Sequence, residues 1–364
     1  MGKKKIVVVG AGLVGEKMVE CLGDSRIFRK SEIKVLARSS RKQILAGKEF
    51  EVKEITPEAF EGIDIALFAG TEGEKGAAVT FVEEAIKRGV TVIDNGGDFR
   101  LRPDVPLVVP EVNPEDLDWH KGLIANPNCS TILMVVPLKP LYDLSHIKRI
   151  IVTTFQAVSG TGKGAVEELV RQVYSITRWV IEEDLIAQFS PAPKEPYKVF
   201  PRQIAFNLFP HIGSFEEWGY TSEEWKKVRE GRKILGDESI AISATCVRVP
   251  ILNVHSGSIY LETEKKITAL EATEILSRAP GVEVVEIEGK EPYFTPQDAD
   301  GKDEVYVGRI REDPFIENGL WLWVVADNLR KGAALNAVQI AEELVQRDLL
   351  NRTRSLNPEE RFKK

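Results

Sequence analysis

Short apolar runs alternate with helical patterns over the first third of the chain. The expected strands cover residues 5–9, 33–37, 63–69 and 90–94. A helical pattern runs through Cys21, and a second covers residues 77–88. Continuous β-branched runs such as KIVVV are typical of parallel strands that are buried on both faces. Strands that alternate with helices at this spacing predict a doubly wound, Rossmann-type parallel sheet.

From about residue 150 the pattern changes to longer strands rich in β-branched and aromatic residues. Expected strands cover residues 150–156, 241–249, 257–263 and 320–326, and expected helices cover residues 163–185, 222–235 and 268–278. This pattern predicts a second, α+β domain with a mixed sheet.

Two further segments bear on assembly and packing. Residues 186–220, rich in proline and aromatic side chains, are expected to be an ordered excursion at a subunit interface. Residues 332–350 predict an amphipathic helix that returns to the first domain, and the charged residues 351–364 are expected to fray.

Composition narrows the class of protein. The 364 residues are 43% hydrophobic and 29% charged, which fits two domains with real cores. A net charge of −7 argues against nucleic acid as the main partner. Three cysteines do not make a disulfide framework. The apolar run near the N-terminus, residues 6–9, is too short for a signal peptide core, and no stretch approaches the length of a membrane span. We therefore expect a cytoplasmic protein.

A glycine-rich loop follows the first strand and opens the first helix. Its pattern is Gly10-Ala11-Gly12-Leu13-Val14-Gly15. In this context the three glycines permit a tight turn, close approach of a pyrophosphate and close packing of helix on strand. The free N–H groups of the helix favour the phosphates. The alternative interpretation is a tight strand–helix turn without a ligand.

The end of the second strand indicates which dinucleotide is bound. NAD sites usually place an acidic residue there, but this chain has Arg38-Ser39-Ser40-Arg41. A guanidinium with nearby hydroxyls suits a 2′-phosphate, so the sequence predicts NADP. For Arg41 alone, a solvated basic loop is the favoured interpretation. Gly70 and Gly73 follow the next strand, where the backbone can approach the cofactor closely.

Cys129 lies in the run Asn126-Pro127-Asn128-Cys129-Ser130-Thr131, just before an apolar helical pattern. Asn128 or Asn126 can cap that helix, which places Cys129 in its first turn. There, free N–H groups and the helix dipole are expected to lower the thiol pKa and to hold an oxyanion. Cys21 and Cys246 fit the alternative of a small buried hydrophobe.

Several motifs in order resemble the aspartate-β-semialdehyde dehydrogenase family over nearly the whole chain. They are GAGLVG, LARSS, DVPLVVPEVN, NPNCST, FQAVSGTGKGAVEEL, PHIGSFEEWGYTSEEWKK, SATCVRVPILNVHS, VGRIR and WVVADNLRKGAALNAVQIAE. The N-acetylglutamyl-phosphate reductases are similar in plan, but they typically have Gly-Cys-Tyr where this chain has Asn128-Cys129-Ser130.

The resemblance implies a role for each matching residue. The implied catalytic residues are the nucleophile Cys129, the acid/base residue His255 and the orienting residue Gln156. The implied substrate contacts are Arg248 for a carboxylate, Glu223 for an amino group, Lys226 and Arg100 for phosphate, and Asn128 beside the nucleophile. The implied cofactor contacts are Gly10, Gly12, Leu13, Val14, Gly15, Arg38, Ser39, Ser40, Gly70, Gly73, Ser159, Gly160 and Asn328. No metal is expected.

The resemblance also implies the reaction and the assembly. NADPH would reduce β-aspartyl phosphate reversibly to aspartate β-semialdehyde and inorganic phosphate through a thioester on Cys129, in lysine, methionine and threonine biosynthesis. The chain would divide into an NADP-binding domain (1–127 with 329–364) and a catalytic and dimerisation domain (128–328). It would assemble as a homodimer or a tetramer.

The chain departs from the family pattern at three places. Gly96-Gly97-Asp98 stands where a Ser-Ser pair is common, Gly257 where Glu is common, and Gly70-Thr71-Glu72-Gly73 where Ala-Gly-Gly-Ser is expected. These changes bear on cofactor preference and on the phosphate loop, and they leave the catalytic set intact. Three alternatives stay open: an N-acetylglutamyl-phosphate or malonyl-CoA type reductase, a non-catalytic NADP-binding paralogue and a Cys-His hydrolase.

Overall fold

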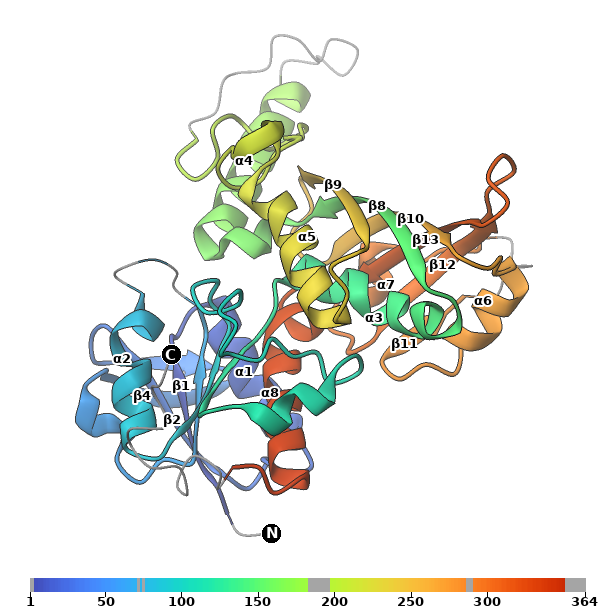
Figure 1. Ribbon diagram of the computed structural model, residues 1–364. Helices are drawn as coiled ribbons and strands as arrows, with labels where there is room; N and C mark the ends of the chain where they lie inside the picture. The colour runs from blue at the N-terminus through green and yellow to red at the C-terminus, as the bar shows by residue number, and fades with distance from the viewer. Residues whose placement is uncertain (1–2, 71–72, 74–75, 183–196, 286–290, 351–364) are drawn as a thin grey trace.

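The computed structural model describes residues 3–70, 73, 76–182, 197–285 and 291–350. These residues form two sheets with helices packed on them (Figure 1). None of the helices within these ranges is long and apolar enough to cross a bilayer.

The first sheet has seven strands in the order β3-β4-β2-β1-β5-β6-β7. The strands are β1 (Lys5–Val9), β2 (Glu32–Ala37), β3 (Arg41–Leu45), β4 (Lys48–Glu54), β5 (Ile65–Phe68), β6 (Thr91–Asp94) and β7 (Leu123–Ala125). All neighbours are parallel except β3 and β4, which form an antiparallel hairpin. The chain extends the sheet in both directions from β1, so the predicted doubly wound sheet is confirmed.

Helices cover both faces of this sheet, as the continuous apolar strands predict. Ile6 and Val8 lie in one core with helices α1 (Leu13–Asp24) and α8 (Leu335–Gln346). Val7 and Val9 lie in the other core with α2 (Ala77–Lys87). The predicted return of the C-terminal helix is therefore confirmed. A π-helical turn, Arg330–Ala334, precedes α8.

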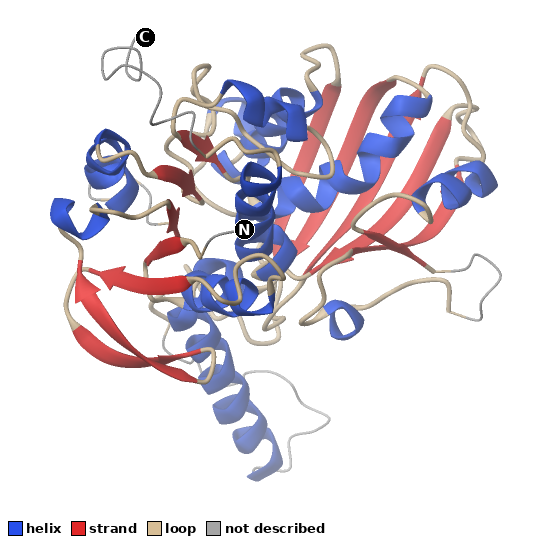
Figure 2. Cartoon of the chain, turned by 90° about the horizontal axis from the view of Figure 1, so that it is seen from below, coloured by secondary structure: helices blue, strands red, loops and turns tan. Residues whose placement is uncertain are grey.

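The second sheet has six strands in the order β11-β12-β13-β10-β8-β9, drawn side by side in Figure 2. The strands are β8 (Ile147–Gln156), β9 (Ala241–Arg248), β10 (His255–Thr263), β11 (Val282–Val284), β12 (Val305–Glu312) and β13 (Gly319–Ala326). The pairs β8–β9 and β11–β12 are parallel and the other three pairs are antiparallel, so the predicted mixed sheet is confirmed.

Three helices pack on one face of the second sheet: α3 (Cys129–Leu144), α5 (Ser222–Leu235) and α6 (Ala269–Leu276). Alternate residues of β8 show that the two faces of this sheet differ in burial. Ile150 and Val152 are fully buried, while Ile151 between them is partly exposed. The register places Ile151 on the same face as Trp321 and Trp323 of β13. On this second face the short helix α7 (Pro296–Ala299) contacts β13, and Trp323 packs against the small cluster that contains Ala299, whereas Ile151 of β8 stays exposed.

Helix α4 (Lys163–Glu182) projects from the second sheet and is drawn at the top of Figure 1. Residues 197–209 pack on it, with Phe200, Ile204 and Phe209 in a small core with Leu169 and Ile176. Of the predicted excursion, residues 186–196 lie outside the described residues, as does the tail 351–364. The remaining short helical elements are the 3-10 turns η1 (Pro57–Phe60), η2 (Pro114–Trp119), η3 (Val158–Thr161) and η4 (Glu217–Gly219), and the helix α7 (Pro296–Ala299).

Candidate active site

Cys129 is the first residue of α3, where the sequence predicts it. Asn128 is the cap, because its Oδ1 accepts hydrogen bonds from the backbone N–H groups of Ser130 (3.0 Å) and Thr131 (3.3 Å). Asn126, the other candidate cap, is buried and donates to Asn95 and to the carbonyl of Ala333 instead.

The three cysteines differ in exposure. Cys129 is partly exposed, whereas Cys21 and Cys246 are buried. Burial raises the pKa of the Cys21 thiol to about 12 and that of Cys246 to about 11. Cys21 and Cys246 are therefore inert core residues, and Cys129 is the one cysteine of the three that keeps part of its surface exposed.

The expected low pKa of the Cys129 thiol is wrong. Burial and the Glu223 carboxylate raise this pKa above its ordinary value. Lys227, Arg100 and Arg248 act in the opposite direction without reversing the shift. The position at the helix N-terminus is as predicted, but desolvation of the sulfur and a nearby anion outweigh it.

Three strands end or begin at the edge of the second sheet nearest to Cys129. Gln156 ends β8, Arg248 ends β9 directly beside it, and His255 begins β10. All three lie on the sheet face that α3 covers, because the register places them with Ile150 and Val152. Residues that are 127 positions apart in the chain, from Asn128 to His255, are thus brought to one site.

His255 is buried and neutral. Burial and the nearby Arg248 guanidinium lower its pKa to about 3. Its Nδ1 accepts a hydrogen bond from the Ala157 N–H (3.1 Å), so the proton of the neutral ring resides on Nε2. Within the described chain, Nε2 has no hydrogen-bond partner. An unpaired buried N–H of this kind is available to a substrate oxygen.

Gly160 leaves space in front of His255 and Arg248. A Cβ at position 160 would lie 3.3 Å from His255 Nε2 and 3.4 Å from Arg248 Nη1. Arg248 itself is held by a 2.5 Å hydrogen bond from Nη1 to the Ala157 carbonyl. Gly160 also lines the cavity that is described below. The cavity therefore extends to the catalytic side chains.

Glu223 joins the candidate substrate residues into one network. Its carboxylate accepts hydrogen bonds from Asn128 Nδ2 (3.0 Å) and Gln156 Nε2 (3.1 Å), and Lys226 Nζ lies 3.6 Å from it. Burial raises its pKa, but Lys227, Lys226 and the hydrogen-bond donors together hold the pKa well below the usual range. The carboxylate is therefore ionised.

The two candidate phosphate contacts have different environments. Arg100 is buried, and it donates to the carbonyls of Asn126 (2.9 Å) and Asn95 (2.7 Å) and to Glu230 Oε1 (3.1 Å). It therefore braces the segment that leads into Cys129. Lys226 keeps 28% of its side chain exposed and is the more accessible cation.

A cavity of about 540 Å³ lies over the glycine loop. Nine of the expected cofactor residues line it: Gly10, Gly12, Leu13, Val14, Gly15, Arg38, Gly70, Ser159 and Gly160. Arg41 and Lys163 also line it, so three cations surround the cavity. The placement of Arg41 and Lys163 was not predicted from the sequence. The sequence favours a solvated loop for Arg41, and no role was assigned to Lys163.

The glycine loop has the shape that a dinucleotide needs. Gly10 has φ +112°, and a Cβ on Gly15 would lie 1.8 Å from the Gly10 carbonyl oxygen, so neither position accepts a larger residue. A Cβ on Gly12 would meet nothing within 4 Å, which leaves its outer side open to a ligand. These observations fit a nicotinamide dinucleotide with its pyrophosphate on the loop.

Four expected cofactor residues do not line the cavity. Ser39 and Ser40 are exposed, and Ser40 Oγ accepts from the Glu54 N–H (3.0 Å). The Gly73 N–H donates to the Asp98 carboxylate (3.0 Å). Asn328 is buried and bonds Ser159 Oγ (3.0 Å) and the Val254 N–H (2.9 Å), so it positions residues next to the site.

Two departures from the family pattern have structural counterparts. A Cβ at Gly257 would lie 3.1 Å from Val324 Cγ2 and 3.2 Å from Leu133 Cδ2, so α3 leaves no room for a glutamate there. In the Gly96-Gly97-Asp98 run, the aspartate carboxylate anchors the loop at Gly73.

Sequence reasoning missed three residues that touch the nucleophile segment. Lys227 and Glu230 contact Asn128, and a Cβ at Gly332 would lie 2.9 Å from Cys129 Cβ. The signal for the first two was present, because positions 223, 227 and 230 share one face of the predicted helix. No local pattern links Gly332 to Cys129, which is about 200 residues away.

Comparisons with known proteins agree with this geometry. Residues 5–120 match the family described as semialdehyde dehydrogenase, NAD binding domain, and residues 138–331 match semialdehyde dehydrogenase, dimerisation domain. The aspartate-semialdehyde dehydrogenase of Aquifex aeolicus is 50% identical over 96% of this chain and all of its own length. That of Bacillus subtilis is 43% identical over 95% of this chain and 98% of its own.

A solved structure has the same fold over nearly the whole chain. Aspartate semialdehyde dehydrogenase II of Vibrio cholerae, in complex with ASA, has a TM-score of 0.86 and 41% identity, and covers 95% of this chain and 99% of its own. The first sheet with its open glycine loop is accordingly an NAD(P)-binding domain. The chain belongs to the aspartate-semialdehyde dehydrogenase family, and its activity is that of an aspartate-semialdehyde dehydrogenase.

Proposed function

We propose that this dehydrogenase reduces β-aspartyl phosphate to aspartate β-semialdehyde and phosphate, with NADPH, through a thioester on Cys129. The observation that carries this proposal is that a partly exposed cysteine at the start of α3 and a neutral imidazole with an unused Nε2 proton both lie near the Arg248 guanidinium. Covalent catalysis by sulfur divides the reaction into two easier steps.

The substrate contacts proposed are those of the buried network. Arg248 suits the α-carboxylate, Glu223 the α-ammonium, and Lys226 with Arg100 the phosphate, while Gln156 and Asn128 orient the acyl group. Support comes from the ionised state of Glu223, the exposed part of Lys226 and the relative from Vibrio cholerae, which was solved in complex with ASA.

The proposed steps assign each proton. Cys129 attacks the acyl carbon, and the phosphate leaves with the thiol proton. When NADPH is bound, it supplies the hydride that converts the acyl group to the aldehyde level. His255 donates a hydrogen bond from Nε2 to the oxygen that gains negative charge, as a neutral imidazole can. The C–S bond then breaks, the aldehyde leaves, and Cys129 takes up a solvent proton.

The proposed cofactor preference is NADP over NAD. Arg38 and Arg41 line the cavity at the end of β2, and Lys163 lines it from the start of α4. Three cations suit the extra phosphate of NADP, which NAD lacks.

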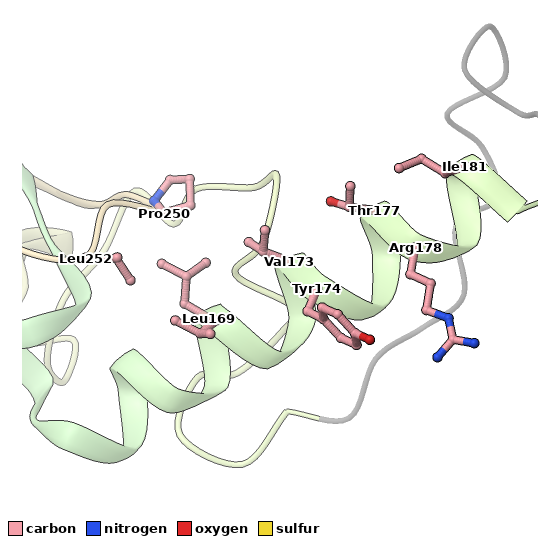
Figure 3. Close-up of a pocket in the computed structure, with 9 residues that line it drawn as sticks. Leu169, Val173, Tyr174, Thr177, Arg178, Ile181, Pro250 and Leu252 are labelled. Carbon is pink, nitrogen blue, oxygen red and sulfur yellow. The ribbon is translucent and has the colours of Figure 1, made fainter.

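We also propose the domain division 1–127 with 329–364 and 128–328, and a homodimer formed by the second domain. The division is supported by β7 ending at Ala125 and by α8 packing on the first sheet. The dimer is supported by the matched dimerisation family and by an apolar groove along α4, whose lining includes Val173, Tyr174 and Ile181 (Figure 3). Exposed apolar grooves are typical of protein interfaces.

The mechanism is tested with Cys129→Ala. We expect no turnover in a phosphate-dependent assay with aspartate semialdehyde, while NADPH binding, measured by fluorescence, stays at the wild-type level. Cys21→Ala is the matched control, because this buried thiol should not affect turnover. Wild-type rates in Cys129→Ala would exclude the thioester.

A further inference from the structure

Helix α5 buries four charged side chains: Glu223, Glu224, Lys227 and Glu230. Burying a charge is strongly unfavourable unless the charge is paired and hydrogen-bonded. Glu224 has a structural role, because it forms a capping box with Thr221 and accepts from the Cys246 N–H (3.0 Å). Glu223 belongs to the substrate network. Lys227 and Glu230 are left without a role in the reaction described above.

Lys227 has no exposed side-chain surface, and all three N–H donors of its ammonium are used. They reach Asn128 Oδ1 (2.9 Å), the Glu223 carbonyl (3.2 Å) and Glu223 Oε1 (3.2 Å). Its neighbour Lys226 is partly exposed, so the two lysines are not equivalent. Lys227 is directed at the helix cap, and no donor remains for a substrate.

Glu230 holds the same segment from the next turn of α5. One carboxylate oxygen accepts from the Asn128 backbone N–H (2.8 Å), and the other accepts from Arg100 Nη1 (3.1 Å). Its side chain is almost fully buried. Asn128 is thereby held at its backbone nitrogen by Glu230, at Oδ1 by Lys227 and at Nδ2 by Glu223.

We propose that Lys227 and Glu230 are positioning residues that hold Asn128, and through it the Cys129 thiol, in the geometry for attack. Cys129 follows Asn128 directly, and the Asn128 side chain that Lys227 holds is also the cap of α3. A rotation of this amide would release the cap and move the sulfur. The proposal rests on Cys129 being the nucleophile.

The charge on Lys227 has a second effect at the same place. It lowers the pKa of the Cys129 thiol, as do Arg100 and Arg248, against burial and Glu223, which raise it. Lys227 itself stays charged, because Glu223 raises its pKa against the effect of burial. Removing this cation should therefore make the thiolate harder to form.

Lys227→Met tests the proposal, because methionine fills a similar volume without charge or donors. We expect kcat to fall roughly 10- to 100-fold, as small misplacements of a reacting group do. The rate of Cys129 alkylation by iodoacetamide should reach its midpoint at higher pH than in the wild type. The dissociation constant of NADPH should not change. A lowered melting temperature with wild-type kcat and alkylation midpoint would show a structural role only and would overturn the proposal.

A matched control and a second variant complete the test. Lys139→Met removes a lysine of α3 that pairs with Asp143, far along the helix from Cys129, and should leave kcat and the alkylation profile unchanged. If Lys227→Met does not fold, Glu230→Gln decides, because unchanged kcat in this near-isosteric variant overturns the proposal and a fall supports it. Cys129→Ala is assayed in parallel. Activity in that variant would refute the mechanism itself, whereas failure of the lysine variant alone refutes only the positioning.

Discussion

Burial acts in opposite directions on the thiols and on the imidazole of this protein. It raises the pKa of Cys129, Cys21 and Cys246, and it lowers that of His255 to about 3. Both effects favour the neutral form. At neutral pH the site therefore holds a thiol and a neutral imidazole rather than a preformed thiolate–imidazolium pair.

The buried thiol of Cys21 should make the protein less stable in alkali. Its folded pKa of about 12 lies above the ordinary 9.0, so the unfolded chain loses this proton first. This contribution to stability is present below pH 9 and is lost as pH rises toward 12, on the order of a few kcal/mol. Thermal unfolding of wild type and Cys21→Ala should converge or cross as pH rises from 8 to 11. Parallel curves would contradict the raised pKa.

Arg38→Ala should change cofactor preference. The KM for NADPH should rise roughly tenfold or more, while the KM for NADH changes little, because only NADPH carries the 2′-phosphate. Steady-state assays with each cofactor measure both values. Lys42→Ala, which removes a nearby exposed lysine paired with Glu49, is the control. Equal losses with both cofactors would remove Arg38 from 2′-phosphate recognition.

Elements with a strong pattern or clear ends were predictable from the sequence. Helix α5 was predicted at residues 222–235 as observed, because Thr221 and Glu224 form a capping box and Gly236 ends the helix in the left-handed region. The β3–β4 hairpin was missed, because its strands are polar on most positions and turn through Ala46 and Gly47. Strands β7 and β11 have three residues each, which is too few for a period.

The candidate site also has a part that was predictable from local sequence and a part that was not. The local cap placed Cys129 and the glycine loop placed the cofactor cavity, since both signals lie within a few residues. The pKa of Cys129 depends on Glu223, Lys227 and burial, which come from distant elements. Gly332 reaches Cys129 only through the π-helical turn before α8. Such contacts are set by tertiary packing and leave no local pattern.

The π-helical turn should tolerate no side chain where it meets the nucleophile. In Gly332→Ala, the added Cβ would lie 2.9 Å from Cys129 Cβ and 3.3 Å from its Cα, so the sulfur must shift. We expect kcat to fall roughly 100-fold with NADPH binding retained. Gly23→Ala is the matched control, because a Cβ there meets nothing within 4 Å. Full activity of Gly332→Ala would show that the backbone here can shift to accommodate the added Cβ without moving the sulfur.

At the scale of the whole molecule, the apolar surfaces gather on the second sheet and its α4 extension. On one face of the six-stranded sheet the short helix α7 contacts β13 beside Trp323, and Ile151 of β8 is exposed. The groove along α4 adds exposed apolar residues, among them Tyr174 and Ile181. A second copy of the chain is the proposed cover.

Ile181→Glu should weaken the proposed dimer. A charge placed in the apolar groove would be buried on association, and the free energy of desolvating that charge exceeds the free energy gained from the apolar contact. Light scattering after size exclusion should show a shift toward monomer at micromolar concentration. Ile44→Glu is the matched control, because this isoleucine is similarly exposed but lies on β3 of the first sheet. An unchanged mass for Ile181→Glu would place the interface elsewhere.

Helix α8 has a consequence for biosynthesis on the ribosome. It supplies Ala337, Ile340, Ala341 and Leu344 to the core that covers β1 and α1, which are made first. Until those late residues emerge from the exit tunnel, the core around Ile6, Val8 and Met18 lacks the part that α8 supplies. We therefore expect this core to be incomplete through most of translation, and the nascent chain to depend on chaperones during that time.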